Sequence, residues 1–292
     1  MNMKRARSRG DKIFDAVIAL ILILLAAVTI IPFMQVVTIS LSPIEVINKF
    51  GQHIIPEKIT LEGYRTVFKH QTIWNGYLNT IVRTVVGTVL SVFLYICGAY
   101  PLSKKHMPNK KFWTLMIIFT MYFSGGLIPN YLLVTKTLGM KDSFWSLILP
   151  GAMSAYTLII VRNFFMEIPE EIEESAKLDG ANDIRILFGI IVPLSKPVLA
   201  TVSLWTVVYH WNNWFDCMLY ISDEKRHVLQ LILRRILLEG QVQDLTMIAG
   251  STVNTDSVKM AALVVATLPI IIIYPFLQKY FVKGVMVGAV KG

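Results

Sequence analysis

The stretch Val17-Ile-Ala-Leu-Ile-Leu-Ile-Leu-Leu-Ala-Ala27 decides which class of protein this sequence encodes. It lies inside a longer apolar segment that runs from Ile13 to about Ile39. About 20 mostly apolar residues are enough for a helix to cross the hydrocarbon core of a membrane. A secretory signal peptide has a shorter apolar core, followed by a cleavage site with small residues. No such site follows before Pro32, so we interpret the segment as a retained transmembrane span.

The composition of the whole chain supports a membrane protein with several spans. Hydrophobic residues make up 54% of the 292 residues and charged residues only 16%, against about 45–50% and 25% in soluble domains. An ordinary cytosolic enzyme and a disordered chain are therefore excluded. The net charge of +9 could suggest nucleic-acid binding. In a chain this apolar, however, it is more typical of Lys and Arg in cytoplasmic loops, and we expect no nucleic-acid partner.

Five further segments have the length and apolar character of spans. They are Tyr77 to Leu102, Phe112 to Val134, Phe144 to Phe164, Ile190 to Tyr220 and Val258 to Phe281. The sequence therefore predicts an all-α, polytopic membrane protein with six transmembrane helices in the lipid bilayer. Its predicted organisation is a basic N-terminus over residues 1–12, a six-span domain over residues 13–281 and a C-terminal tail over residues 282–292.

The distribution of Lys and Arg predicts the orientation of the spans. The N-terminus and the connection between spans two and three are basic, whereas the connection between spans three and four has two Lys. The basic residues are Lys4, Arg5, Arg7, Arg9, Lys12, Lys104, Lys105, Lys110 and Lys111. Because basic loops stay in the cytoplasm, we expect both termini there. The long segments Ser40 to Gly76 and Ile221 to Ser257, with Gln52 and Gln241, should then lie outside.

The one long segment that faces inward in this topology, residues 167–189, has the pattern of a helix, a turn and a second helix. Pro169 and the acidic residues after it suit a helix start, because Pro lacks an N–H and carboxylates favour the positive end of the helix dipole. Small residues recur at helical spacing, and Gly180 suits the left-handed geometry that ends a helix. Asn182 can cap a second helix. We expect this unit to lie at the cytoplasmic surface, where its small side chains would allow close approach of another backbone.

The same segment carries a motif that resembles a known family. It reads Glu174-Ser175-Ala176, three residues, Gly180, nine residues, Ile190, one residue, then Val192-Pro193. With Ser for Ala and Val for Leu, this is similar to the motif of permease subunits in bacterial ATP-binding cassette (ABC) importers. Leu178-Asp179-Gly180-Ala181, the run Trp211-Asn212-Asn213 and the terminal Val-Lys-Gly resemble the sugar-importing branch, in particular the smaller permease of the maltose importer. The run Phe123 to Pro129 looks like the group that imports alginate and other uronic-acid oligosaccharides.

The resemblance implies a coupling role for the inner segment, in which its helix sits in a cleft of an ATPase subunit. The residues that the resemblance assigns to this role are Glu174, Ser175, Ala176, Leu178, Asp179, Gly180 and Ala181. The implied partners are a second permease, two ATPase subunits, an extracytoplasmic solute-binding protein and an oligosaccharide, in the bacterial cytoplasmic membrane. ATP and Mg would be bound by the ATPases, since this chain has no phosphate-binding G-x-x-x-x-G-K-[ST] loop. The alternative is an amphipathic helix on the membrane surface, although its acidic residues would be repelled by anionic lipid.

Polar residues within the spans are the candidates for a substrate path, because such residues usually face the interior of the bundle or a wet cavity. The candidates are Asn79, Arg83, Tyr122, Asn130, Trp211, Asn212 and Asn213. Asn79 and Arg83 share one helical face. Hydrogen bonds between helices are the alternative role for the Asn residues, and snorkelling to the outer surface is the alternative for Arg83. In the maltose system the sugar is held mainly by the other permease, which puts a strong binding role in doubt.

Two other functional classes fit the sequence less well. A secondary transporter of small solutes, the alternative that we retain, would normally show internal repeats and acids at mid-span. A membrane enzyme needs a nucleophile with a base, or a metal set; the five His residues are scattered without ligand spacing. We therefore expect no catalytic, metal or cofactor site in this chain. The outer segments are nearly neutral, so an acidic substrate is suggested by the resemblance alone.

Overall fold

The computed structural model describes residues 9–49, 54–238 and 254–289. The chain divides into two compact units, one formed by residues 1–70 and 235–267 and the other by residues 71–234 and 268–292. We call them unit 1 and unit 2 and describe each by itself. Several predictions concern positions outside the described residues, namely the basic residues before Arg9, the outer location of Gln52 and Gln241, and the final Val-Lys-Gly.

Regular secondary structure in the described residues is entirely helical, which confirms the predicted all-α class. Unit 1 contains α1 (Arg9–Ser40), α2 (Ile44–Ile47) and α3 (Glu62–Lys69), together with the last residues of α13 (Leu229–Leu238) and the first part of α15 (Thr255–Ala289). Ser257 donates a hydrogen bond to the carbonyl of Ser40 at 3.3 Å. A Cβ atom on Gly63 would lie 2.9 Å from Ser257 Oγ, so glycine lets α3 approach α15 closely.

The apolar stretch that opened the sequence forms the middle of α1. Residues 12–40 form a helix long enough to cross a membrane, and its most apolar part is not buried by any other part of the described chain. A helix that is apolar on all sides without a soluble core around it is typical of a span in contact with lipid or with another subunit. The first predicted span is therefore confirmed as a helix.

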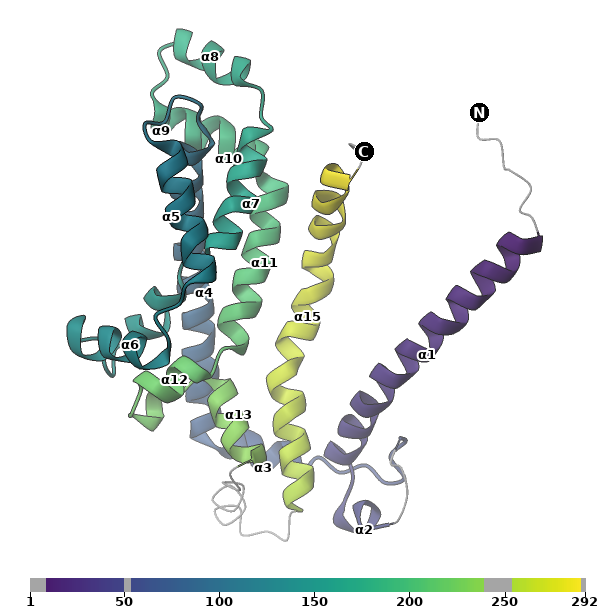
Figure 1. Cartoon of the computed structure of the whole chain (residues 1–292). Helices are drawn as coiled ribbons and strands as arrows, with labels where there is room; N and C mark the ends of the chain where they lie inside the picture. Colours follow the sequence, from purple (N-terminus) through teal and green to yellow (C-terminus); the bar gives the residue numbers. More distant parts are fainter. Residues whose placement is uncertain (1–8, 50–53, 239–253, 290–292) are drawn as a thin grey trace. The chain divides into compact units, whose positions relative to one another are not determined.

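Unit 2 contains the last part of α15, from Leu268 on, and the remaining helices, which are coloured from blue to green in Figure 1. They are α4 (Gln71–Ser103), α5 (Lys110–Tyr122), α6 (Leu127–Leu132), the π-helix η1 (Leu133–Thr137), the 3₁₀-helices η2 (Phe144–Leu147) and η3 (Leu149–Gly151), α7 (Ala155–Met166), α8 (Glu170–Leu178), α9 (Asp183–Ile186), the π-helix η4 (Leu187–Ile191), α10 (Val192–Leu194), α11 (Lys196–Asn212), α12 (Phe215–Tyr220), the 3₁₀-helix η5 (Glu224–Arg226) and the start of α13.

Three of the six predicted spans are bent rather than straight. The spans of α1, α4 and α15 are continuous, whereas the other three are pairs of helical segments that meet at 111°, 55° and 82°. The sharpest bend follows α5 at Gly125-Gly126, where Gly126 has a φ of +87° that glycine adopts without strain. The second lies just after Pro150-Gly151, and the third lies at Ser195, between Pro193 and Pro197. Six spans are therefore present if each bent pair counts as one.

Helix α15 continues as one helix to Ala289, although it contains Pro269 and Pro275. It therefore crosses the predicted boundary at residue 282 without an interruption. The start of the C-terminal tail is not marked by a helix end, and its assignment as a separate cytoplasmic segment stays a prediction.

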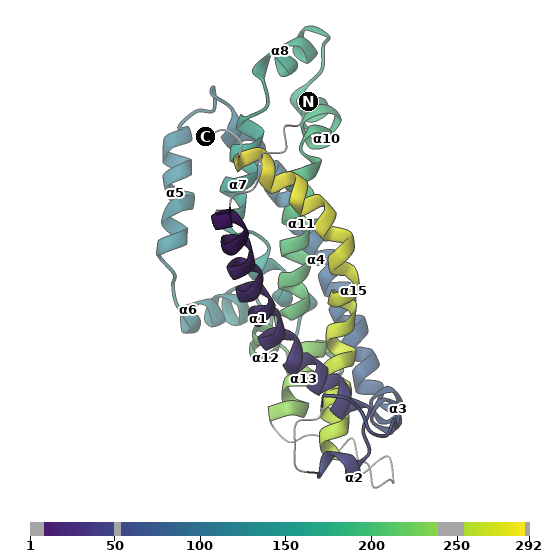
Figure 2. The same ribbon diagram turned by 90° about the vertical axis from the view of Figure 1, so that its right-hand side faces the viewer.

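The core of unit 2 lies where α4, α7 and α11 pack side by side, as both ribbon views show (Figures 1 and 2). Tyr95 and Ala99 of α4, Val161 of α7 and Val202 of α11 are buried there, together with Ile191 from η4. The chain that follows the inner turn is thus anchored in the same core. Helix α8 lies beyond one end of this bundle, which we call the α8 end, and α12 lies at the opposite end, which we call the α12 end.

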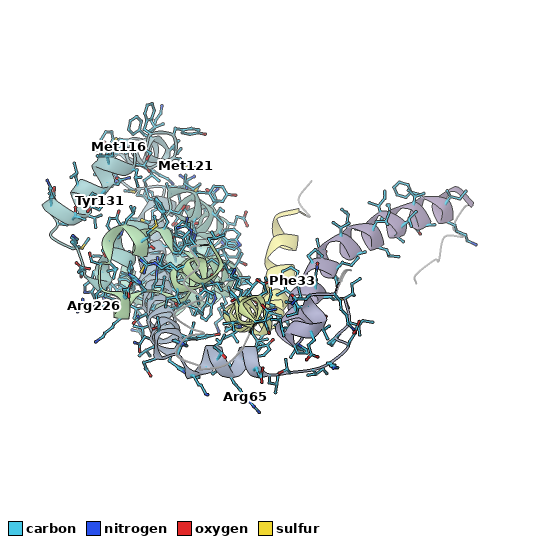
Figure 3. All side chains as sticks on the ribbon, turned by 90° about the horizontal axis from the view of Figure 1, so that it is seen from below. Phe33, Arg65, Met116, Met121, Tyr131 and Arg226 are labelled. Carbon is cyan, nitrogen blue, oxygen red and sulfur yellow. The ribbon has the colours of Figure 1, made fainter. Side chains whose placement is uncertain are left out.

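The α12 end is closed by contacts between segments that are distant in sequence. The rings of Tyr131 and Tyr220 stack with centroids 6.1 Å apart. Asp142 donates its backbone N–H to the carbonyl of Tyr220 at 2.9 Å and accepts Arg226 Nη1 at its own carbonyl, at 2.7 Å. Tyr131 and Arg226 are labelled in Figure 3, which views the molecule from this end. These bonds fix the loop after η1 against the segment that follows α12.

Candidate functional site

The predicted inner segment folds as a helix, a tight turn and a short second helix. Pro169 precedes α8, and Glu170, Glu171 and Glu173 occupy its first turn, as the charge pattern predicted. In the turn, Gly180 has a φ of +81°. The N–H of Ala181 donates to the carbonyl of Ala176, and that of Gly180 to the carbonyl of Lys177, both at 3.0 Å. This pair of bonds is a Schellman motif, and it confirms the role predicted for Gly180.

The second helix of the segment begins at the predicted cap. Asn182 accepts a hydrogen bond from the backbone N–H of Arg185 at 2.8 Å through its side-chain oxygen. Helix α9 then passes into η4, whose Leu187 and Ile191 are buried in the core of unit 2. A displacement of the turn at Gly180 would therefore be transmitted directly into the packed bundle.

Helix α8 is also tied to the end of α4 by two ion pairs. Lys104 pairs with the buried carboxylate of Glu173, and its Nζ lies 4.0 Å from the centre of the Tyr100 ring. Lys105 Nζ lies 2.9 Å from Glu170 Oε2 at the surface. This hydrogen bond lowers the pKa of Glu170 and raises the pKa of Lys105. From the sequence, the two lysines predicted the orientation of the spans, and the acidic residues predicted the start of a helix. Lys104 and Glu173 are 69 residues apart, and no sequence pattern indicated that they would pair.

The seven residues predicted for coupling divide between two faces of the segment. Ala176 and Ala181 pack against the core of unit 2. The small side chain of Ala176, which is only partly buried, lets α8 lie close to its own bundle. Its predicted contact with another subunit stays a prediction. The other five predicted residues are exposed: Glu174, Ser175, Leu178, Asp179 and Gly180. Leu178 has 91% of its surface exposed, so no part of unit 2 covers it.

Arg83 lies in the interior of unit 2, near the α12 end. Its side chain is 0% exposed, so the alternative that it snorkels to the outer surface is wrong. Its Nη1 donates to the carbonyl of Asn213 at 2.8 Å and to Asp216 Oδ1 at 3.1 Å, and its Nη2 pairs with Asp216 Oδ2. Two opposite charges at membrane depth avoid the cost of a lone charge by pairing, and bidentate geometry makes this pair strong.

Asp216 is held at the break between α11 and α12. Its carboxylate also accepts the side-chain amide of Asn213 at 3.1 Å and the backbone N–H of Cys217 at 2.7 Å. From the sequence, Asp216 can be identified as a polar residue near the outer end of its span, but its pairing with Arg83 cannot. The sequence did contain a signal, since one span holds an Arg and another holds an Asp. A lone charge inside a membrane is unfavourable, so two opposite charges in different spans favour a pair.

Asn79 and the adjacent Thr80 bind the backbone of the segment after α12. Asn79 Nδ2 donates to the carbonyls of Lys225 at 2.9 Å and His227 at 3.0 Å, and Thr80 Oγ1 accepts the N–H of Leu229 at 2.8 Å. Asn79 and Arg83 do share one face of α4, as predicted. That face holds other parts of unit 2 in place, which favours the alternative of structural hydrogen bonds for Asn79.

The other candidates for a substrate path are spread over unit 2. Trp211 is buried and meets the ring of Tyr77 edge-on, with centroids 6.4 Å apart. Asn212 is exposed and donates to the carbonyl of Val208 at 3.0 Å. Tyr122, 79% exposed at the end of α5, and Asn130, exposed on α6, do not belong to the buried Arg83 cluster. Exposed side chains also cover α5, as Met116 shows (Figure 3).

The described residues contain no group of three or more His, Cys, Asp or Glu side chains that could hold a metal ion. Two arrangements of the predicted residues stand out in unit 2: an exposed turn at the α8 end and a buried ion pair at the α12 end. Neither arrangement places a nucleophile beside a base.

A comparison with known families shows what this architecture belongs to. The family model described as the inner membrane component of binding-protein-dependent transport systems matches residues 72–287. The chain belongs to this family. The permease is therefore a subunit of a membrane transport system, and the match includes every element of unit 2 described above.

Similar proteins share nearly the full length of the permease. It is 40% identical to the polygalacturonan/rhamnogalacturonan transport system permease protein YtcP of Bacillus subtilis (strain 168), over 97% of this chain and 99% of that protein. It is also 40% identical to Protein LplC of the same organism, over 98% and 97% of the two chains. In the crystal structure of a bacterial ABC transporter involved in the import of the acidic polysaccharide alginate, one chain matches with a TM-score of 0.89 and 32% identity, over 95% and 100% of the two chains.

Proposed function

We propose that the permease pairs with a second, different permease in an ABC importer and that its cargo is an acidic oligosaccharide. We further propose that an ATPase subunit binds the exposed turn between α8 and α9. The observation that carries the coupling role is that Leu178, the last residue of α8, has 91% of its surface exposed, while α8 itself lies beyond the end of the bundle (Figure 2).

The coupling role follows from how this segment is built. Leu178 offers an apolar side chain that no part of unit 2 covers, while Ala176 and Glu173 hold the same helix to its own bundle. A partner that grips the exposed face can therefore move α8 as a rigid body, and the core contacts of η4 carry that movement into the bundle. Rigid displacement of packed helices is the usual way in which such transitions are transmitted.

The proposed orientation places the α8 end and both termini in the cytoplasm. Lys104 and Lys105 lie at this end, next to α8, and basic residues favour the cytoplasmic side. ATP and Mg would be bound by the partner ATPases, which leaves this chain a transport role without chemistry of its own. Cysteine substitutions on the two predicted outer segments, labelled in intact cells with an impermeant reagent, test the orientation; labelling only after lysis would reverse it.

The acidic cargo is supported by the relatives. One of the 40% identical proteins is named for polygalacturonan and rhamnogalacturonan transport, and the structural neighbour is described as importing alginate. Galacturonan and alginate share a pyranose ring that carries a carboxylate. We therefore assign the permease to the import of oligosaccharides of uronic acids.

The cargo is tested with the complete complex of both permeases, the ATPases and the binding protein in proteoliposomes. Uptake of oligogalacturonides and alginate oligosaccharides is compared with uptake of maltohexaose, which is neutral. We expect ATP-dependent uptake of at least one acidic oligosaccharide and little of the neutral one. Uptake of maltohexaose alone would overturn the assignment of an acidic cargo.

The coupling segment is tested by Leu178→Asp, which changes an exposed side chain at the α8 end. Leu138→Asp is the matched control, because Leu138 is also exposed but follows η1 near the α12 end. We expect co-purification of the ATPase to fall at least tenfold in Leu178→Asp and to be unchanged in Leu138→Asp. Equal retention in both variants would show that the ATPase binds elsewhere.

A further inference from the structure

A cavity of about 390 Å³ opens between α4, η3, α7 and α11, entirely within unit 2. Its volume lies in the range of pockets that hold small ligands. It is lined by Tyr95, Gly151, Met153, Ser154, Thr157, Trp205, Thr206 and Tyr209. The cavity shares none of its lining residues with those that the sequence singled out for a substrate path.

The lining combines aromatic faces with hydroxyl groups. Trp205 and Tyr209 are one helical turn apart on α11, hence on one face, and are 37% and 45% exposed. The hydroxyls of Ser154 and Thr157 and the indole N–H of Trp205 make no hydrogen bond to another residue in the described part of the chain. These groups are thus available to a ligand that accepts and donates hydrogen bonds.

The position of the aromatic residues is fixed by neighbouring contacts. Tyr209 accepts a hydrogen bond from Asn213 Nδ2 at 3.2 Å, and Asn213 in turn binds Asp216. The Tyr95 hydroxyl accepts the backbone N–H of Ser154 at 2.9 Å. A Cβ atom at Gly151 would collide with the hydroxyl of Tyr209, so glycine keeps this ring in place. The cavity is therefore a formed site and not a chance gap between loosely packed helices.

We propose that this cavity binds one pyranose ring of the transported oligosaccharide. A sugar ring has C–H faces that pack on aromatic rings, which Trp205 and Tyr209 offer, and hydroxyls at its edge that pair with Ser154 and Thr157. Unpaired polar groups at membrane depth usually face a wet path rather than lipid. The proposal rests on the proposed function in so far as the cargo is a sugar.

The lining contains no Lys, Arg, His, Asp or Glu. The cavity can therefore bind the ring and its hydroxyls, but it has no charged side chain that would bind the carboxylate of a uronic acid. Two consequences follow. An acidic ring and a neutral ring should bind here to a similar extent, and any preference for acidic cargo must be imposed elsewhere in the transport system.

The test compares variants in the complete complex with binding protein and ATP present. Trp205→Leu removes the stacking surface, Thr157→Val removes one hydroxyl at constant shape, and Trp205→Phe restores a ring. Tyr156→Leu is the matched control, since Tyr156 is an exposed aromatic residue beside Thr157 that does not line the cavity. We expect uptake to fall at least fivefold in Trp205→Leu and about twofold in Thr157→Val, and to recover in Trp205→Phe. Co-purification of the partners should be unchanged in all four variants, and basal ATP hydrolysis should be unchanged in the control Tyr156→Leu.

A second measurement reports occupancy directly. Thr157→Cys in a Cys97→Ala/Cys217→Ala background is alkylated with a maleimide, with and without oligogalacturonide or maltohexaose in excess. We expect whichever sugar the wild-type complex imports to slow alkylation at least threefold, whether it is acidic or neutral. Normal uptake in Trp205→Leu, or alkylation that the imported sugar leaves unchanged, would overturn the proposal. If the complex imports maltohexaose alone, the proposal of an acidic cargo is overturned, and the cavity is then tested by protection with maltohexaose. A complex that imports no sugar would overturn both proposals.

Discussion

The two ends of unit 2 are held together in different ways. At the α12 end, Arg83 is fully buried, and its charge and that of Asp216 are satisfied within the subunit. At the α8 end, the pair of Lys105 and Glu170 is exposed to solvent, and Leu178 projects without a covering residue. The ion pair at the α12 end is enclosed in the single chain, whereas the exposed pair at the α8 end lies on a surface that a partner can cover.

The difference indicates which end can change its contacts at low cost. Separating a buried ion pair leaves charges without water or a partner, which is strongly unfavourable. An exposed pair exchanges its partner for water, and the free-energy difference is small. We therefore expect the contacts at the α12 end to persist during transport, whereas the exposed pair of Lys105 and Glu170 can open when a partner binds and moves α8 as a rigid body.

The largest effect is expected for Arg83→Leu, which leaves the carboxylate of Asp216 buried without its cation. Breaking such a pair costs about 3–5 kcal/mol, so the variant should lose much of its thermal stability in detergent. The double variant Arg83→Leu/Asp216→Leu removes both charges and should recover most of that loss. A single variant as stable as the wild type would show that the pair is not buried in the assembled protein.

A smaller effect, specific to the other end, is expected for Gly180→Val. The φ of +81° is unfavourable for a residue with a Cβ by about 1–2 kcal/mol. A Cβ there meets no other part of the chain within 4 Å, so we expect the backbone strain, and not a steric clash, to displace the turn. The six spans should still insert, whereas ATPase binding and sugar-stimulated ATP hydrolysis should fall. Gly189→Val is the control, since a Cβ there meets no atom beyond its own stretch of helix within 4 Å and its φ is not positive. Normal uptake with full ATPase retention in Gly180→Val would contradict the coupling role.

Lys104→Met tests whether α8 must be tied to α4. The variant leaves the buried carboxylate of Glu173 without its partner, so we expect fewer sugar molecules imported per ATP hydrolysed, with the ATPase still bound. The exchange Lys104→Glu/Glu173→Lys keeps opposite charges at the two positions and should restore the ratio in part. An unchanged ratio in Lys104→Met would mean that the core contacts of η4 carry the movement alone.

The smallest effect is expected for Lys105→Met, because both members of this pair are exposed. Lys105 lowers the pKa of Glu170 in the folded protein, so the pair stabilises the fold above the unfolded-state pKa of Glu170. This contribution is lost as the pH falls through the lowered, folded-state value. The small stability difference between variant and wild type at pH 7 should therefore vanish in acid, as measured by thermal unfolding from pH 7 to pH 3. A difference that persists at pH 3 would have another cause.

Features encoded locally could be predicted from the sequence. The spans follow from apolar length, and the Gly180 turn and the Asn182 cap follow from residue types at fixed offsets. The pairing of Arg83 with Asp216 could not be predicted, because it joins residues 133 positions apart and depends on how α4 and α11 pack. The bends in three spans likewise could not be predicted, except that the two glycines at Gly125-Gly126 favour either a kink or close helix packing.

The choice between aromatic residues on α11 shows the same limit. The sequence analysis selected Trp211, which lies next to two Asn residues, but the structure buries it and exposes Trp205 and Tyr209 instead. On a helix that is apolar around its whole circumference, sequence pattern does not show which face meets the core. Only the packing of α11 on α4 and α7 decides which of these rings is free to meet a ligand.

The guanidinium of Arg83 also determines the electric field at the break in the fifth span. The carboxyl end of a helix carries a partial negative charge, and at α11 the carbonyl of Asn213 is covered by an N–H of Arg83. The remaining positive charge of Arg83 is cancelled by Asp216. The break therefore carries no net charge from this pair, so its field neither attracts nor repels ions along the fifth span.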